Sequence, residues 1–190
     1  MKIIKTFNKK EIKIYDDLIP YDVRLKLYRF INDSFFRVNG NDEILVENQM
    51  EQHIFSTYSK TDLDNTNFLK IPEIKHILKE VENYEIQQTR INLSTLSDKN
   101  HFHVDNTAGW DVKTLIYYPN MRWIIDWGGY TLFANENLSE IEYCASYKPG
   151  RIILFDGSIP HCIAPPTNFA PCFRYSFIIQ FKKNKNGNFI

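Results

Sequence analysis

The stretches HFHVDN, residues 101–106, and GSIPHCIAPPTNFAPCFRYSF, residues 157–177, carry most of the information about this chain. His103 and Asp105 stand two positions apart, so on an extended segment their side chains point to the same face. His161 lies in the second stretch, and a folded sheet can bring it beside the first pair. The three side chains together can form a metal site of two imidazoles and one carboxylate.

Two imidazoles and one carboxylate on one side of a metal, with open positions opposite, are typical of sites at which Fe(II) reacts with dioxygen (O2). Arg174 follows His161 by thirteen residues, and its planar guanidinium suits the carboxylate of a dicarboxylate cosubstrate. We therefore interpret these residues as a site for Fe(II) and 2-oxoglutarate. His101 competes with His103 for the ligand position, because an extended HFH segment places both on one face.

The composition indicates a folded protein without a strong charge preference for its partners. The chain has 190 residues, of which 43% are apolar and 15% aromatic, so it suits a single domain with a sizeable core. Its 23 basic and 23 acidic residues cancel, and we expect no nucleic acid or membrane partner. The N-terminus lacks a secretory pattern, no apolar run approaches the ~20 residues of a membrane span, and three cysteines show no CxxC spacing. We expect a cytoplasmic protein with reduced thiols.

The order of patterns along the chain predicts helices first and strands after them. Residues 11–20 predict a short strand, residues 21–36 a helix, and the segment after Pro72 a second helix. Residues 39–67 are polar and weakly patterned, so we expect a loop there. The predicted later strands are 86–96, 111–119, 129–134, 140–147, 151–157 and 174–181.

This order predicts an α+β fold that is mainly β, a sandwich or jelly roll with N-terminal supporting helices. We expect one domain over residues 1–190. Its N-terminal strand and helices would occupy residues 1–84, and its β core would occupy residues 85–182.

Five motifs stand in a specific order in the second half of the chain. They are HVDN (103–106), TLIYYPN (114–120) with Trp123 soon after, WGGYTLF (127–133), PGRIILFDGSIPH (149–161) and RYSF (174–177). Together they resemble the core of the 2-oxoglutarate- and Fe(II)-dependent dioxygenases, in particular the prolyl 4-hydroxylase-like branch that includes the oxygen-sensing prolyl hydroxylases. The resemblance covers residues 92–181, and the N-terminal half matches only in general pattern.

The resemblance implies a double-stranded β-helix with three iron ligands, His103, Asp105 and His161. It also implies that Arg174 pairs with the distal carboxylate of 2-oxoglutarate. Tyr117 occupies the position at which this family offers a phenol to the same carboxylate. Ser176 shares the face of Arg174 on its predicted strand and can add a hydroxyl donor.

The implied reaction is the hydroxylation of an unactivated C–H bond, with decarboxylation of 2-oxoglutarate to succinate and CO2. Asp105 favours hydroxylation, because halogenating relatives lack this carboxylate so that chloride can bind iron. The branch suggests a prolyl or other peptidyl residue as substrate, although small-molecule and sugar hydroxylases share the same core. The substrate and the oligomeric state stay open at this point.

The sequence departs from the family pattern at two places. The family often has a tyrosine about ten residues before the first ligand, where this chain has Leu93, so Asn92 or Arg90 can face the site instead. The segment from His161 to Arg174 carries three prolines and is longer than in the oxygen sensors. Both differences bear on the substrate and the cosubstrate rather than on iron.

Two other functions compete with this interpretation. A cupin-like metal-binding barrel would act on a small molecule without 2-oxoglutarate, and PGRIILFDGSIPH resembles the second half of a cupin pattern. Cupins usually present a His-x-His pair with a glutamate, here His101 and His103, and would have no need of Arg174. A non-catalytic barrel used for protein contact is the other alternative, and the intact triad with its arginine argues against it.

Overall fold

The computed structural model of the protein describes residues 2–5, 8–34, 36–39, 53–58, 66–96, 98, 100–105 and 110–184. Two antiparallel sheets form most of it. The large sheet has eight strands in the order β1-β2-β9-β6-β11-β5-β4-β3, and the small sheet has three in the order β10-β7-β8. The strands of the large sheet are β1 (Lys2–Lys5), β2 (Glu11–Tyr15), β9 (Ile152–Asp156), β6 (Trp110–Tyr117), β11 (Arg174–Asn184), β5 (Glu85–Ser94), β4 (His53–Tyr58) and β3 (Arg37–Asn39). Those of the small sheet are β10 (His161–Ile163), β7 (Thr131–Ala134) and β8 (Ile141–Ala145).

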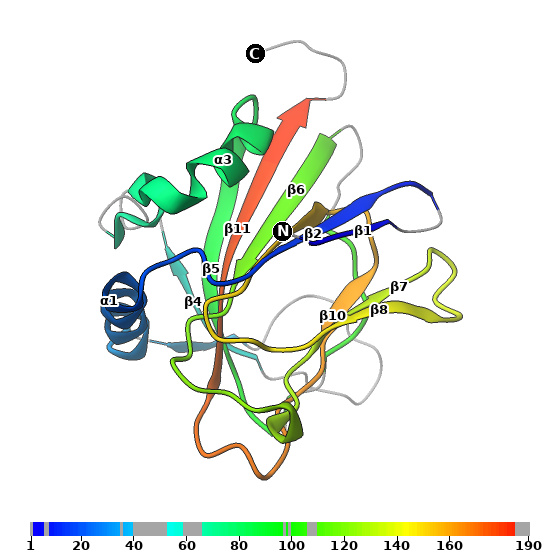
Figure 1. Ribbon diagram of the computed structural model, residues 1–190. Coiled ribbons are helices and arrows are strands. Elements are labelled where there is room, and N and C mark those ends of the chain that lie inside the picture. Colours follow the sequence, from blue (N-terminus) through cyan, green and yellow to red (C-terminus); the bar gives the residue numbers. More distant parts are fainter. Residues whose placement is uncertain are drawn as a thin grey trace.

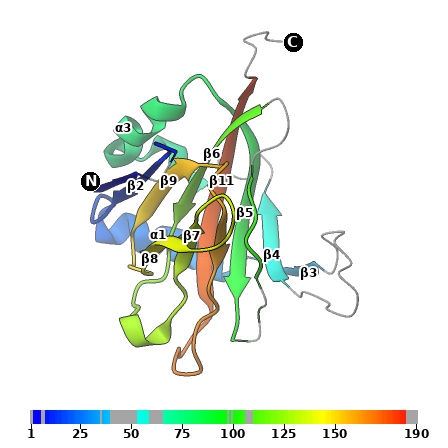
Figure 2. The same cartoon turned by 90° about the vertical axis from the view of Figure 1, so that its right-hand side faces the viewer.

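The helices cover the face of the large sheet that is turned away from the small sheet. In Figure 1, α1 (Tyr21–Asn32) and α3 (Lys75–Leu78) lie to the left of the large sheet and β7, β8 and β10 lie to its right. Figure 2 shows the same layers after a quarter turn. The remaining helices are short 3-10 turns, namely η1 (Phe68–Lys70), η2 (Pro72–Ile74), η3 (Lys79–Val81) and η4 (Ile125–Trp127).

Alternation along the strands divides the apolar residues into two cores. The first core lies between the large sheet and the helices and includes Leu115 and Tyr117 of β6. The second core lies between the two sheets and includes Ile116 of β6 and Tyr118 immediately after it. Successive strand residues point to opposite faces, so each core draws on every second position.

The N-terminal helical segments differ in how closely they follow the predicted pattern. The segment predicted as a helix over residues 21–36 contains α1, which ends at Asn32 and buries Leu27 and Ile31 one turn apart. The helix predicted after Pro72 is instead a chain of short turns, η2, α3 and η3. Short helices gain little stability by themselves, and these take the geometry that burial of their apolar side chains allows.

The prediction of a loop over residues 39–67 is wrong for residues 53–58. These form strand β4, which pairs with both β3 and β5. The pairing with β5 supplies hydrogen-bond partners to the backbone of β4, and such pairing does not require a strong side-chain pattern. Residues 40–52 and 59–65 of the expected loop lie outside the described residues. Short strand β10 was likewise not predicted, and it forms against β7.

The described chain is therefore mostly β, with two antiparallel sheets packed face to face and few helices. This architecture is consistent with a jelly roll. Among the described helices, none is both long and apolar enough to span a membrane.

Candidate active site

The two stretches that carry His103 and His161 lie side by side in the structure. The backbone N–H of His103 donates to the carbonyl of His161 at 3.0 Å, and the reverse hydrogen bond measures 2.9 Å. The N–H of Asp105 donates to the carbonyl of Gly157 at 2.8 Å. His103 thus forms an isolated bridge rather than a full strand. One potential ligand atom from each of His103, Asp105 and His161 lies within 4.8 Å of the other two.

Both imidazoles turn the same ring nitrogen toward Asp105. Nδ1 of His161 lies 2.9 Å from the carbonyl oxygen of Ile159, and Nδ1 of His103 lies 3.2 Å from that of His101. A carbonyl only accepts, so these contacts require a proton on Nδ1, and in the neutral ring they leave the Nε2 lone pair for a metal. Nε2 of His161 is 3.6 Å from Oδ2 of Asp105, and Nε2 of His103 is 3.8 Å from Oδ1.

The side chains around the triad hold its members in place. Oγ1 of Thr114 donates to Oδ2 of Asp105 at 2.5 Å, and such hydrogen bonds orient carboxylates that bind metals. The ring of His161 packs against Phe155 and Phe133 at centroid distances of 4.7 and 6.2 Å. Burial lowers the pKa of His161, while the nearby Asp105 acts in the opposite direction. The neutral imidazole is the form that binds a metal.

This donor set fits the metal that the sequence suggests. Two imidazole nitrogens and one carboxylate oxygen, all on one side, leave room for further ligands on the other. The side chain of His103 is 59% exposed, whereas those of Asp105 and His161 are each 7% exposed. The triad is therefore open to solvent on the side of His103.

Arg174 begins β11 and is completely buried between the two sheets. Its Nε donates to the carbonyl of Gly129 at 2.7 Å, and its Nη2 lies 3.5 Å from Oγ1 of Thr131. The guanidinium carbon lies over the rings of Tyr118 and Tyr147, 5.3 and 5.1 Å from their centroids. Among the described residues Nη1 has no hydrogen-bond partner. A buried donor without a partner is costly, so this guanidinium suits an anionic ligand.

Ser176 shares the face of Arg174, as predicted. Tyr175 and Phe177 belong to the core on the helix side, so the residues between and before them face the small sheet. The hydroxyl of Ser176 is buried and, like Nη1 of Arg174, has no hydrogen-bond partner among the described residues. Two unsatisfied donors on one face fit a carboxylate such as the distal group of 2-oxoglutarate.

Tyr117 requires a correction. It packs on the helix side of the large sheet, with its ring centroid 5.4 Å from that of Phe68. Tyr118 lies between the sheets beside Arg174, and its hydroxyl is 2.7 Å from Oγ1 of Thr131. Adjacent residues of an extended chain face opposite sides, so only one of the two tyrosines can reach the guanidinium. In this chain the tyrosine beside the guanidinium is Tyr118.

Strand β7 connects the triad to Arg174. His161 pairs with Phe133 across β10 and β7, and Thr131 stands two residues before Phe133 on the same face. Residues two apart on a strand are about 7 Å apart. Since Thr131 also lies beside Arg174, the triad and the guanidinium lie on the same face of the small sheet.

Three further residues considered in the sequence, Arg90, Asn92 and His101, lie outside the His-Asp-His group. Leu93 belongs to the core on the helix side, so alternation places Asn92 and Arg90 on the face of β5 that Ser176 shares, and Asn92 pairs with Ser176. His101 is exposed, and its ring is not part of the ligand group that the described residues form. Its carbonyl instead orients the ring of His103.

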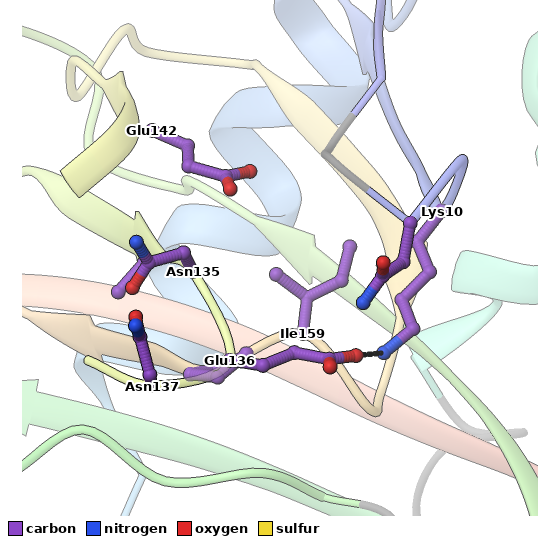
Figure 3. A pocket seen from close by; sticks show the side chains of 9 residues that line it. Lys10, Asn135, Glu136, Asn137, Glu142 and Ile159 are labelled. Carbon is purple, nitrogen blue, oxygen red and sulfur yellow. Dashed lines mark hydrogen bonds and ion pairs between the residues drawn. The ribbon is translucent and has the colours of Figure 1, made fainter. Parts of the chain in front are cut away.

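Two hollows adjoin the segments that lead to these residues. One, of about 330 Å³, lies next to Ile159 and Pro160, just before His161. Figure 3 shows the polar side chains that line it around Ile159, namely Asn135, Glu136, Asn137 and Glu142, with Lys10 bonded to Glu136. The other, of about 370 Å³, lies next to Cys172 and Phe173, just before Arg174.

Sequence reasoning missed several residues that complete the site, namely Thr114, Tyr118, Gly129, Thr131, Tyr147 and Asn120. A partial signal existed for two of them. Thr114 and Tyr118 stand four positions apart in TLIYYPN, so a strand assignment places both on one face. The others come from segments that only the folded chain brings to Arg174.

Comparison with known proteins identifies the fold. No family model matches the sequence, and no curated protein matches it significantly. A prolyl hydroxylase from Trichoplax adhaerens, solved with a peptide fragment of the hypoxia inducible factor oxygen degradation domain, is similar in structure with a TM-score of 0.67. It is 14% identical, and the match covers 92% of this chain and 84% of that one.

Two further solved structures give the same result. A 2OG-Fe(II) oxygenase family oxidoreductase from Burkholderia pseudomallei has a TM-score of 0.66 and 9% identity, covering 92% of this chain and 88% of that one. A viral collagen prolyl hydroxylase from Paramecium Bursaria Chlorella virus-1, solved as a 2OG complex, has a TM-score of 0.59 and 12% identity, covering 90% and 95%. The chain therefore has the fold of the prolyl hydroxylases and of the 2OG-Fe(II) oxygenases.

Proposed function

We propose that this chain is an Fe(II)- and 2-oxoglutarate-dependent dioxygenase that hydroxylates an unactivated C–H bond. One observation carries the proposal. A His-Asp-His group and a buried guanidinium share one face between the sheets, and Nη1 of that guanidinium has no partner in the described part of the chain. The first group suits a metal ion with open positions, and the second suits a carboxylate. 2-Oxoglutarate has a metal-chelating end and a distal carboxylate in one molecule.

The side chains of the triad would hold the metal. Nε2 of His103, Nε2 of His161 and an oxygen of Asp105 would be its ligands, with Thr114 orienting the carboxylate. When bound, Fe(II) and 2-oxoglutarate would supply the oxidation, in which one atom of O2 enters the substrate as a hydroxyl and the other enters succinate, with loss of CO2. The protein would hold the reactants in place and limit the access of water.

The residues around Arg174 would orient the cosubstrate. Nη1 of Arg174 and the hydroxyl of Ser176 would donate to its distal carboxylate. Tyr118 would complete this pocket in place of Tyr117. The aromatic and apolar surroundings would strengthen the pairing, since charges interact more strongly away from water.

For the substrate we propose a prolyl or other peptidyl residue. The neighbour from Trichoplax adhaerens was solved with a peptide fragment, which supports a peptide as the substrate class. We also propose that residues 1–190 work as one oxygenase domain. In support, β2 from the first half of the chain pairs with β9 from the second, and β4 pairs with β5.

The test is anaerobic addition of Fe(II) and then 2-oxoglutarate to metal-free protein, with detection of the visible charge-transfer band of the chelate. We expect a band in the wild type and none in His161→Ala. In Arg174→Ala we expect the Kd for 2-oxoglutarate to rise about a hundredfold, because a buried charge-assisted pair is lost. The exposed residues His76 and Arg122 provide matched controls, His76→Ala and Arg122→Ala, which should behave as the wild type.

A folded wild type without a band would contradict the proposal and favour a metal-binding barrel that acts without 2-oxoglutarate. A band that survives in His161→Ala would contradict the assignment of the ligands. If the band forms, peptides with a single proline can be screened for a mass increase of one oxygen atom.

A further inference from the structure

We infer that Asn120 and Tyr147 are positioning residues that set the place and direction of the Arg174 guanidinium for the carboxylate of the 2-oxo acid. The inference rests on the proposed function and extends it to two residues outside the predicted site. Neither residue is expected to touch the cosubstrate. Their effect would pass through the backbone of β11 and through the ring beneath the guanidinium.

The need for such residues follows from the end of strand β6. The pairing of β6 with β11 begins at Tyr117 and Phe177, so Arg174, Tyr175 and Ser176 have no strand partner on that side. The N–H of Tyr118 donates to the carbonyl of Arg151, on the β9 side of β6, and the pairing of β6 with β11 does not continue past Tyr117. The backbone around Arg174 therefore requires other hydrogen-bond partners on its β6 side, because buried backbone groups are costly when unpaired.

The side chain of Asn120 takes the place of the missing strand. It is 1% exposed. Its Nδ2 donates to the carbonyl of Phe173 at 2.9 Å, and its Oδ1 accepts from the N–H of Tyr175 at the same distance. One amide thus bonds the residues immediately before and after Arg174, as a neighbouring strand would.

Tyr147 acts on Arg174 in two ways. Its hydroxyl lies 2.6 Å from Oδ1 of Asn120 and 2.8 Å from the carbonyl of Tyr175, and its single proton is donated to one of these two acceptors. The same hydroxyl oxygen accepts from the backbone N–H of Asn120 at 3.2 Å, so Tyr147 contacts both the amide residue and the strand. Its ring stacks on Tyr118 with centroids 4.2 Å apart and 12° between the planes, and both rings lie under the guanidinium. A cation over an aromatic face is attracted to it.

These contacts leave Arg174 one defined geometry. Asn120 and Tyr147 hold its backbone, Gly129 binds Nε, and the two rings support the guanidinium plane. The group is thus arranged before any ligand arrives, which lowers the cost of binding a carboxylate in one orientation. Loss of the amide would free the backbone at Arg174 without removing the guanidinium itself.

The test compares two ligands of equal length in Asn120→Ala, Asn120→Asp and Tyr147→Phe. 2-Oxoglutarate has the distal carboxylate, and 2-oxopentanoate has a methyl group there. The Kd of each acid is measured from the anaerobic Fe(II) charge-transfer band. Tyr15→Phe is the matched control, because it also removes a hydroxyl hydrogen bond of a buried tyrosine, to Glu80, in the other core.

We expect the wild type to prefer 2-oxoglutarate strongly. In Asn120→Ala and Tyr147→Phe the Kd of 2-oxoglutarate should rise about tenfold or more, whereas the Kd of 2-oxopentanoate should stay unchanged within about twofold. Asn120→Asp should show the same loss of preference, since it keeps the acceptor for Tyr175 but loses the donor to Phe173. In metal-free protein, the amide hydrogen of Tyr175 should exchange faster in Asn120→Ala, and Tyr15→Phe should change neither readout.

An equal rise in the Kd of both acids would overturn the inference, because a general structural defect weakens the binding of both ligands. An unchanged preference in the folded variants would also overturn it while leaving the proposed function intact. A wild type that binds neither acid would overturn the proposed function and this inference with it. Tyr147→Phe keeps the stacked ring, so it tests the hydroxyl even if Asn120→Ala does not fold.

Discussion

Arg174 is fully buried, yet no described carboxylate forms an ion pair with it. Its partners are the carbonyl of Gly129, the hydroxyl of Thr131 and two aromatic rings, none of which carries a full negative charge. Burial of an uncompensated charge is expensive, and proteins keep such groups where a ligand supplies the opposite charge. The same argument applies to the hydroxyl of Ser176, which is buried and finds no hydrogen-bond partner in the ranges that the structure describes.

The two adjacent tyrosines provide a test at the level of single residues. Tyr118→Phe removes the hydroxyl beside Thr131 and Arg174, and we expect the Kd for 2-oxoglutarate to rise about three- to tenfold, the value of one hydrogen bond. Tyr117→Phe removes a hydroxyl on the helix side of the sheet and should leave that Kd unchanged. Titration of the Fe(II) chelate band measures both variants. A larger effect in Tyr117→Phe would show that the alternation of β6 has been assigned to the wrong faces.

The turn before β7, together with β7 itself, connects the His-Asp-His triad to the Arg174 guanidinium. Gly128 and Gly129 both have positive φ, and the Nε1 of Trp123 donates to the carbonyl of Gly128. The next carbonyl, of Gly129, accepts from Arg174. Thr131 and Phe133 lie on the same face of β7, and Phe133 pairs with His161. The turn therefore determines where the guanidinium stands relative to the triad.

Gly129→Ala tests this role of the turn. Its φ is +72°, and a Cβ there would lie 3.0 Å from Cδ and 3.2 Å from Nε of Arg174. We expect a loss of about 1–2 kcal/mol in the free energy of unfolding, from the backbone strain, and at least a tenfold weaker binding of 2-oxoglutarate. Denaturant unfolding and the chelate titration measure the two effects.

Gly150→Ala is the control for backbone strain, because Gly150 has a φ of +82° and its Cβ would meet Arg24 instead. This variant should lose stability without a change in the affinity for 2-oxoglutarate. Equal affinities in Gly129→Ala and the wild type would argue against the turn as the element that positions Arg174.

An ion pair connects the end of β2 to the start of β9 across the large sheet, so it links distant parts of the molecule. Asp16 follows β2, and Arg151 precedes β9. Nε and Nη2 of Arg151 donate to the two carboxylate oxygens of Asp16 at 2.7 and 2.9 Å. Hydrogen bonds from Arg151 hold the pKa of Asp16 below its usual value, against the smaller opposing effect of burial. This bidentate geometry connects the N-terminal segment to the strand that leads toward His161.

The lowered pKa of Asp16 predicts a pH dependence of stability. The folded protein holds the proton less tightly than the unfolded chain, so the pair stabilises the fold above the unfolded pKa. That contribution disappears as the pH falls through the folded pKa. Asp16→Asn should lower the free energy of unfolding at pH 7 by about 1 kcal/mol and should make it less dependent on pH below about 5.

Denaturant unfolding between pH 3 and pH 7 measures this effect, with Asp17→Asn as the control. Asp17 is 70% exposed and pairs with Lys148, so its loss should change stability little. A pH profile of Asp16→Asn parallel to that of the wild type would mean that the pair does not contribute to acid sensitivity.

Part of this architecture follows from local sequence patterns. Strand periodicity located β5, β6, β9 and β11 to within a few residues, because alternation of side chains is a local property. The spacing within HVDN and its relation to the PH of residues 160–161 indicated which three side chains would gather, and they do lie together. The position of Ser176 on the face of Arg174 followed from the same alternation.

Other features depended on contacts between distant segments. Alternation predicts that Tyr117 and Tyr118 face opposite sides, but a shift of one residue exchanges the faces, and only the packing against Phe68 or Arg174 decides between them. Strand β4 formed where the sequence indicated a loop, because β5 offered it backbone partners. Tyr147 lies outside the five motifs, and Asn120 ends the motif TLIYYPN, which does not indicate that its side chain bonds the backbone of β11. Residue types and their spacing were enough to indicate the chemical groups of the candidate site. Which of these groups lie together depends on strand faces and turns, and those are selected by packing between distant segments.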